Sequence, residues 1–138
     1  ADVALNAKDV NTAEYIQEHF GGAHSAVVTA VSKDAFNDAI NAVRAAGKVV
    51  AVGLPSETMD LPIVKAVLDG IEVIGSLVGT RKDLEEAFQF GAEGLVVPIV
   101  QKRPLDDVAA VFAEMEAGTI QGRMVLDMKH QCACGHHH

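Results

Sequence analysis

Tryptophan is absent from this 138-residue sequence, tyrosine occurs once, and 11 Lys and Arg stand against 19 Asp and Glu, giving a net charge of -8. The core must therefore be built from Val, Ala, Leu and Ile. Nucleic acids and anionic membrane surfaces select clustered Lys and Arg, so the acidic balance argues against both as partners. No apolar run reaches the roughly 20 residues of a membrane span, and no basic-then-apolar signal opens the chain. We predict a cytoplasmic protein.

Cysteine is missing from the body of the sequence, because Cys132 and Cys134 both lie in the terminal run HQCACGHHH. A Cys-x-Cys pair is too close for an ordinary disulfide. His130, the two cysteines and His136 to His138 are soft metal ligands at short spacing. The last three histidines resemble a purification tag, so we interpret the run as a tail and predict no metal site. Since the first residue is Ala rather than Met, we expect the chain to be cut from a longer protein.

The composition otherwise suits one compact domain, because 49% of the residues are hydrophobic and no low-complexity tract divides the chain. Apolar runs of strand type alternate with segments of helical spacing. The runs predict strands at residues 2–7, 25–30, 48–53, 71–75, 98–101 and 122–128. The helices are expected to begin near Asn11, Ser32, Asp60, Thr80 and Leu105. The helix after Ser32 has Phe36, Ala39, Ile40 and Val43 on one face, and Gly47 is expected to end it.

Alternating strands and helices indicate parallel strands joined by right-handed crossovers. Because the strands are continuous apolar runs, we expect their sheet to be covered on both faces. The predicted fold class is therefore α/β with a doubly wound parallel sheet. Residues 118–128 are expected to lie apart from the main sheet.

Residues 48–80 (KVVAVGLPSETMDLPIVKAVLDGIEVIGSLVGT) indicate a strand, a turn, a helix and a second strand. The small residues Gly75, Ser76 and Gly79 lie just past the second strand, where a tight turn and a ligand-facing edge are equally good interpretations. No Gly-x-Gly-x-x-Gly or Walker-type phosphate loop occurs. Gly21 and Gly22 follow a helix, so they are interpreted as a helix end.

Residues for acid–base chemistry are few. His19 lies near a helix end and His24 near a strand start, and both are better explained as surface or capping residues. Arg123 is different, because it stands alone in an apolar strand. A charge there requires solvent or an anionic partner. A buried ion pair and a phosphate contact both remain open.

Four runs, GGAHSAVVTAVSKDAF, GKVVAVGLP, LDGIEVIGSLVGTRKDLEEAFQF and GRMVLDM, are spread along the chain from Gly21 to Met128. In this order they closely resemble the zinc-dependent medium-chain alcohol dehydrogenases, particularly bacterial ethanol- or propanol-preferring members. The resemblance implies a Rossmann sheet of order 3-2-1-4-5-6 that holds NAD, of which this chain carries strand 3 onward. It implies a truncated NAD-binding domain at residues 1–94, a segment at 95–129 that returns to the catalytic domain, and a tail at 130–138.

The resemblance also implies roles for ten residues. Thr29, Ala30 and Val31 would flank the adenosine, and Val52, Gly53 and Leu54 would lie near the nicotinamide. Ser76, Leu77 and Val78 would offer backbone groups to its carboxamide. Arg123 would reach the pyrophosphate.

The sequence departs from the family where chemistry is concentrated. The catalytic zinc ligands, the four-cysteine zinc lobe, the glycine-rich turn after strand 1 and the acidic residue after strand 2 are all missing. We therefore expect weak or absent NAD binding and no hydride transfer from a small alcohol by this chain alone, since that step needs zinc as Lewis acid.

Two further expectations follow from the family's sheet order. Strand 3, residues 2–7, would lack its usual neighbour, while residues 25–30, 48–53 and 71–75 would remain a sheet. In the family, strand 6 joins two subunits, so the segment from Ile71 to Val78 is the predicted homo-oligomer interface. The alternatives are a self-associating structural module and an assembly whose other half comes from another chain.

Overall fold

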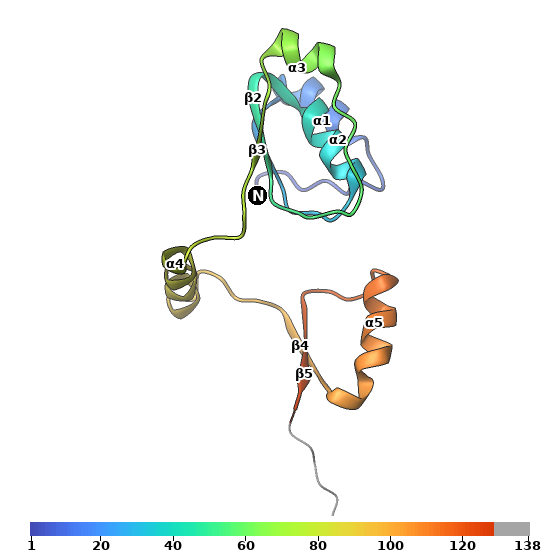
Figure 1. The fold of residues 1–138 in the computed structure, drawn as a ribbon, viewed down its shortest axis with the longest axis vertical. Helices are drawn as coiled ribbons and strands as arrows, with labels where there is room; N and C mark the ends of the chain where they lie inside the picture. The colour runs from blue at the N-terminus through green and yellow to red at the C-terminus, as the bar shows by residue number, and fades with distance from the viewer. Residues whose placement is uncertain (129–138) are drawn as a thin grey trace, which may run out of the picture. The chain divides into compact units, whose positions relative to one another are not determined.

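The computed structural model describes residues 1–128, and the chain divides into two compact units, residues 1–80 and a second unit that begins at Arg81. Figure 1 shows both units as ribbons, coloured along the chain. Each is described below by itself. None of the helices among the described residues combines the length and the apolar character needed to cross a membrane.

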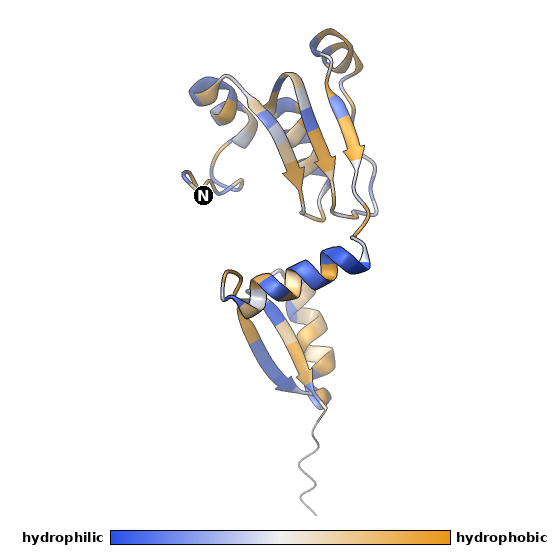
Figure 2. Ribbon diagram, turned by 90° about the vertical axis from the view of Figure 1, so that its left-hand side faces the viewer, coloured by the Kyte–Doolittle hydropathy of each residue, from blue (hydrophilic) through white to orange (hydrophobic). Residues whose placement is uncertain are grey.

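The first unit is built on a three-stranded parallel sheet of order β1-β2-β3. Its strands are β1 (Ala23–Val28), β2 (Val43–Ala51) and β3 (Glu72–Gly75). Figure 2 shows the three strands side by side, with apolar residues toward their arrowheads. The sheet expected from residues 25–30, 48–53 and 71–75 is therefore confirmed, with β1 and β3 at its edges.

Three helices accompany this sheet: α1 (Thr12–Phe20), α2 (Lys33–Ala42) and α3 (Ile63–Asp69). The Asn11 side chain caps α1 by accepting a hydrogen bond from the Glu14 backbone N–H at 3.2 Å. Gly21, with φ +69°, ends α1, and Gly70, with φ +61°, ends α3. Glycine adopts this left-handed conformation without a Cβ clash. The predicted starts and ends of α1 and α2 agree with the structure, apart from the end of α2.

The core of the first unit lies between α2 and the sheet. Phe36, Ala39 and Ile40 are buried on one face of α2, and Val43 and Val49 of β2 complete the packing. This spacing of three and four residues places the apolar side chains on one helical stripe. The predicted helical face is confirmed for Phe36, Ala39 and Ile40, whereas Val43, predicted on the same helix, lies on β2.

The opposite face of this sheet carries no helix among residues 1–80. Figure 1 shows α1 and α2 on the same side of the strands. On the other side Val27, Val50 and Ile74 are paired in register across the three strands, and Val27 is 64% exposed. The parallel α/β sheet is thus confirmed, whereas the second helical layer expected from its apolar strands is not found in this unit.

Residues 2–7 do not form the predicted strand. A parallel strand needs a neighbour that accepts and donates its ladder hydrogen bonds, and residues 2–7 pair with none of β1, β2 and β3. A turn forms instead, in which the Asn6 carbonyl accepts from the backbone N–H groups of Asp9 at 2.9 Å and Val10 at 3.2 Å. Local polar side chains have outweighed the apolar pattern, because Asn6 also donates to the Asp9 carboxylate at 2.7 Å.

The connection from α2 to β2 also differs from expectation, since Gly47 does not end the helix. The helix ends at Ala42, and β2 begins at once with Val43 paired to Ala23. Two residues further along β1, Ser25 is paired with Lys48, so β2 carries extra residues as a bulge. Ala46 adopts φ +58° in this bulge. A Cβ on Gly47 would lie 2.7 Å from the Arg44 carbonyl oxygen, which explains the glycine.

We predict that Ala46→Gly stabilises the protein. Alanine at a left-handed φ is disfavoured by a steric cost of about 1 kcal/mol that glycine avoids. The free energy of unfolding, measured by urea denaturation, should rise by about 0.5–1 kcal/mol. The matched control is Ala45→Gly, next to it and without positive φ, which should lower stability by about 0.5 kcal/mol. Equal effects at both positions would contradict the strain at Ala46.

The second unit begins with α4 (Arg81–Ala92), directly after Thr80, and continues as a strand–helix–strand motif. Its other elements are β4 (Val100–Pro104), the 3-10 turn η1 (Leu105–Asp107), α5 (Val108–Glu116) and β5 (Arg123–Asp127). β4 and β5 form a separate parallel sheet, as expected for residues 118–128. Arg103 on β4 and Glu114 on α5 form a bidentate ion pair, at 2.7 and 3.0 Å, which ties the strand to the helix.

Candidate functional site

The ends of the three strands of the first unit lie at one edge of the sheet. Val28 is paired with Ala51, and Ala51 with Gly75, so the strands finish level with one another. Each of the three predicted triplets follows one of these strands: residues 29–31 after β1, 52–54 after β2 and 76–78 after β3. In open parallel sheets the carboxyl edge is where ligands bind. Nine of the ten predicted site residues therefore lie along this edge, seen at the arrowheads in Figure 2.

Gly53 allows the first two loops to touch. The backbone N–H groups of Val52 and Gly53 both donate to the Val28 carbonyl, at 3.0 and 2.9 Å. A Cβ on Gly53 would lie 2.2 Å from the Ala30 carbonyl oxygen, far inside van der Waals contact. Glycine is required here for space, and the loops 29–31 and 52–54 consequently form one continuous surface.

The loop after β3 presents unused backbone donors. The Ser76 N–H donates to the Ala51 carbonyl at 2.9 Å and is therefore occupied. The N–H groups of Leu77 and Val78 donate to no acceptor among residues 1–128. Val78 also adopts φ +23°, a strained value for a β-branched residue. Backbone strain of this kind is concentrated at ligand sites and switch regions.

Four apolar side chains project from the same three loops. Val31 is 74% exposed, Leu54 81%, Leu77 85% and Val78 94%. A single exposed apolar residue is common, but several along one edge indicate a surface that contacts a ligand or partner. The edge therefore combines an apolar rim with free backbone amides.

A cavity of about 280 Å³ adjoins the β1 end of this edge. Thr29 and Ala30 line it, together with alanine side chains of α2 and Ile16 of α1. Thr12 donates a hydrogen bond to the Asp38 carboxylate at 3.0 Å on its wall. The cavity is mostly apolar, and β1 has no neighbouring strand on this side.

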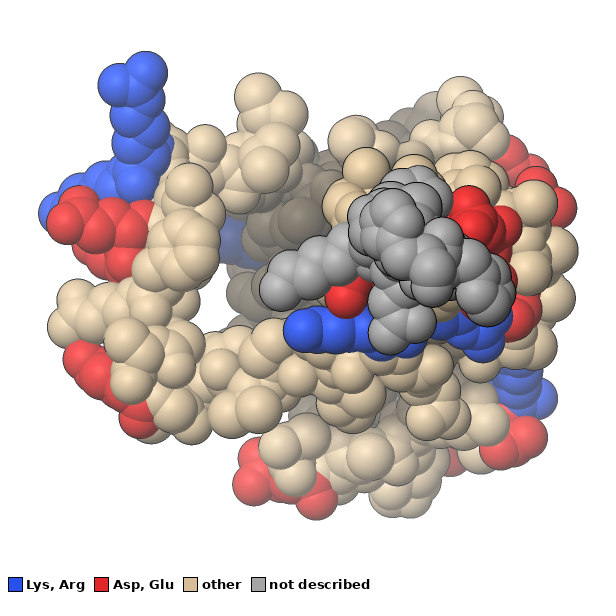
Figure 3. Space-filling model, turned by 90° about the horizontal axis from the view of Figure 1, so that it is seen from below, with Lys and Arg blue, Asp and Glu red and all other residues tan. Residues whose placement is uncertain are grey.

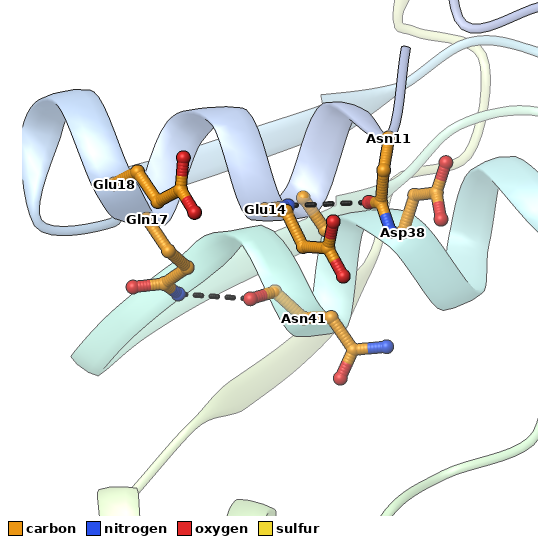
Figure 4. A pocket seen from close by; sticks show the side chains of 7 residues that line it. Asn11, Glu14, Gln17, Glu18, Asp38 and Asn41 are labelled. Atoms are coloured by element: carbon orange, nitrogen blue, oxygen red, sulfur yellow. Dashed lines mark hydrogen bonds between the residues drawn. The ribbon is translucent and has the colours of Figure 1, made fainter.

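A second, polar pocket of about 360 Å³ lies between α1 and α2. Figure 4 shows that Asn11, Glu14, Gln17 and Glu18 come from the α1 side and Asp38 and Asn41 from α2. Gln17 donates from its side-chain amide to the carbonyls of Asn41 at 2.8 Å and Val43 at 3.1 Å. None of the predicted site residues lines this pocket, and its polar contacts serve to join the two helices.

The loop after β2 is fastened to α2 by Asp60. The sequence predicts Asp60 as the cap of α3, but Pro62 occupies that position and α3 begins at Ile63. The Asp60 carboxylate instead forms an ion pair with Lys33 at 2.8 Å, and the Asp60 backbone N–H donates to the Asn37 side-chain oxygen at 3.0 Å. The hydrogen bond and charge of Asp60 raise the pKa of Lys33 above its usual value, so this lysine stays charged throughout the neutral range.

Arg123 lies in the second unit, at the start of β5. Its backbone N–H donates to the Ile99 carbonyl at 2.8 Å, and its side chain is exposed. Its guanidinium forms no ion pair with any other residue of the part that the structure describes. The buried ion pair is therefore the wrong alternative for Arg123, whereas the phosphate contact stays a prediction.

The histidines of the first unit behave as surface residues. The His19 ring stacks on Tyr15 with centroids 3.9 Å apart, and its Nδ1 lies 2.9 Å from the Tyr15 carbonyl oxygen. His24 is exposed on β1. Within residues 1–128, no three His, Cys, Asp or Glu side chains form a group that could hold a metal ion. The Cys and His tail from His130 onward lies outside the described residues.

Charged side chains lie interspersed rather than sorted by sign. On the face that Figure 3 shows, basic and acidic side chains of the described residues lie beside one another. Lys48 pairs with Glu72 at 3.4 Å and Lys82 with Glu86 at 3.7 Å, so each of these positive charges has a negative charge beside it. A basic surface suited to nucleic acid is not built from such pairs.

The sequence profile of the family described as "Zinc-binding dehydrogenase" matches residues 1–93, which include the whole carboxyl edge. The chain belongs to this family. The resemblance inferred from the four sequence runs is thereby confirmed. It agrees with the parallel sheet of β1, β2 and β3, whose fold matches the coenzyme-binding part of such dehydrogenases.

Individual relatives give the same result. An alcohol dehydrogenase of Geobacillus stearothermophilus is 51% identical over 126 residues, which cover 91% of this chain and 37% of the relative. The alcohol dehydrogenase of the hyperthermophilic archaeon Aeropyrum pernix has a TM-score of 0.82 at 24% identity, over 91% of this chain and 37% of the other. An NAD-dependent alcohol dehydrogenase has a TM-score of 0.80 at 23% identity, over 94% and 38%. The two structures show the fold, and this chain spans little more than a third of the length of these relatives.

Proposed function

We propose that this chain forms the nicotinamide-binding part of an NAD-dependent alcohol dehydrogenase, an oxidoreductase that converts a small alcohol to an aldehyde or ketone. The observation that carries this proposal is the carboxyl edge of β1, β2 and β3, where three level strand ends present an apolar rim and free backbone donors. Membership of the family and the 51% identical alcohol dehydrogenase support it. NAD supplies the hydride acceptor, and a cytoplasmic location stays a prediction.

The geometry of the edge refines the proposed contacts with NAD. Thr29, Ala30 and Val31 would take the adenosine side, and the apolar Val52 and Leu54 would cover the nicotinamide, with Gly53 joining the two loops. The carboxamide would accept hydrogen bonds from the N–H groups of Leu77 and Val78. Ser76 would contribute through its carbonyl or hydroxyl, since its N–H is occupied. The exposed Arg123 is a suitable partner for the pyrophosphate.

The zinc of the family has no place among residues 1–128, where no suitable group of ligands occurs, so we derive no step through it. The 138 residues also contain no glycine-rich phosphate loop. We therefore propose that this chain binds NAD weakly and does not oxidise an alcohol by itself.

Fluorescence titration with NADH tests the proposal, and the absence of tryptophan leaves the coenzyme signal free of protein background. We expect saturable binding with Kd on the order of 1 mM. An ethanol and NAD assay should show no turnover. Micromolar affinity would contradict the missing phosphate contacts, and a signal that does not saturate at all would contradict the coenzyme edge.

Self-association is the second candidate function. β3 is an edge strand of the sheet, and the exposed Val73 and Ile74 lie on it. Unpaired apolar edges favour pairing with another chain, so we propose the segment from Ile71 to Val78 as an interface between two copies. X-ray scattering should show a dimer that Val73→Lys converts to a monomer. A concentration-independent monomer would exclude this interface and would leave pairing with a chain that supplies the other half of the enzyme.

A further inference from the structure

We propose that Lys33, Asn37 and Asp60 form a clamp that positions the coenzyme loop, defined as residues 52–62, at the carboxyl edge. The inference rests on the proposed function, because it assigns positioning residues to the same NAD edge. No predicted site residue belongs to the clamp. Lys33 and Asn37 each contact Asp60, so they would act through the loop that carries Leu54.

The coenzyme loop is held at its two ends. At its start, Val52 and Gly53 donate to the Val28 carbonyl. At its end, Asp60 is bound to α2, and the neighbouring Met59 packs against the core. Between these points residues 56–58 are exposed. Figure 1 shows this segment running beside α2 from the end of β2 to α3.

The clamp holds both the side chain and the backbone of Asp60. Lys33 and Asn37 are one helical turn apart, so they lie on the same face of α2. Lys33 binds the carboxylate at 2.8 Å, and Asn37 accepts the backbone N–H at 3.0 Å. Two contacts of different kinds fix the position of the backbone as well as that of the charge. A loop closed in this way samples fewer conformations, which pre-organises Leu54 for a ligand.

The clamp is expected to act locally rather than on global stability. The Lys33–Asp60 pair is partly exposed, and pairs of this kind contribute little to unfolding free energy. Its removal should instead change the dynamics of the coenzyme loop. This separates a positioning role from a general structural one, because only the former changes the affinity of the edge for coenzyme.

The experiment compares Lys33→Met with Lys65→Met, which removes a similar pair to Asp69 at 2.9 Å within α3. Amide hydrogen exchange at residues 53–60 should become about two- to fivefold faster in Lys33→Met, with a changed Leu54 amide shift. The affinity for NADH, followed by NMR titration, should weaken by a similar factor. Lys65→Met should leave the exchange rate, the Leu54 shift and the NADH affinity unchanged. Lys33→Arg should keep all three at their wild-type values, and the exchanged pair Lys33→Asp with Asp60→Lys should restore them.

Each outcome decides the proposal. Unchanged exchange and Leu54 shift in Lys33→Met, or equal effects in Lys65→Met, would overturn the clamp. Faster exchange with unchanged NADH affinity would overturn the positioning role. Failure of the wild-type chain to bind NADH would reject the proposed function instead, and the clamp would then be decided by exchange and by the Leu54 shift alone.

Discussion

Gly53→Ala should be the most disruptive single substitution at the carboxyl edge. The added Cβ would lie 2.2 Å from the Ala30 carbonyl oxygen and 3.2 Å from the Thr29 carbonyl carbon, so one of the two loops must move. Backbone atoms cannot yield as a flexible side chain does, and we expect a loss of about 3 kcal/mol in the free energy of unfolding. NADH binding should become undetectable. Urea denaturation and the fluorescence titration measure the two effects.

Gly75→Ala is the matched control for this prediction, because Gly75 ends the adjacent parallel strand β3. Nothing lies within 4 Å of the position that its added methyl group would take. Stability should therefore change by no more than about 0.5 kcal/mol. If Gly75→Ala were as destabilising as Gly53→Ala, the edge would tolerate a methyl group at neither position. The close approach of the two loops would then not be the cause of the lost stability.

Gly122→Ala should disrupt the second unit to a similar extent. Gly122 has φ +77°, and its added Cβ would lie 2.4 Å from the Ile99 carbonyl oxygen. That carbonyl accepts the hydrogen bond from the Arg123 N–H which starts the pairing of β4 with β5. We expect a loss of about 3 kcal/mol, combining left-handed strain with overpacking. Hydrogen exchange of the amides in β4 and β5 measures it.

Gly118→Ala separates these two causes. Gly118 is also left-handed, with φ +66°, but nothing lies within 4 Å of an added Cβ. Gly118→Ala should therefore lower the free energy of unfolding by only about 1 kcal/mol, the cost of left-handed strain. If Gly122→Ala lost no more than Gly118→Ala, the contact with Ile99 would be too loose to set the position of Arg123.

The sequence was sufficient where a local signal and the tertiary environment agree. Asn11 and Gly21 mark the two ends of α1, as predicted, because side-chain capping and a left-handed glycine act within a few residues. The parallel sheet followed from alternating strands and helices. The strand predicted at residues 2–7 does not form, because strand formation depends on a neighbouring strand that an apolar pattern does not reveal. Likewise Gly47, expected to end α2, serves instead to make room beside Arg44 in the bulge of β2.

The residue pattern alone indicated only a ligand-facing edge within residues 48–80. The loops at residues 29–31, 52–54 and 76–78 were assigned by the resemblance to the alcohol dehydrogenases, and their contacts stay a prediction. Which backbone donors are free was not predictable, since the use of the Ser76 N–H by Ala51 depends on strand pairing. The contacts of Asp60 with Lys33 and Asn37 were also missed. They join residues 27 and 23 positions apart, and only the spacing of Lys33 and Asn37 on one helical face hinted at a shared partner.

The most direct test of the coenzyme edge is an amide-resolved NMR titration of the chain with NADH. We expect progressive shifts at residues 29–31, 52–54, 77 and 78, with smaller changes in the helices on the covered face of the sheet. Leu77 and Val78 should move most, because their N–H groups are the free donors. Shifts concentrated at Asn11, Glu14 and Gln17 in the pocket between α1 and α2, with none at the three strand ends, would contradict the assignment.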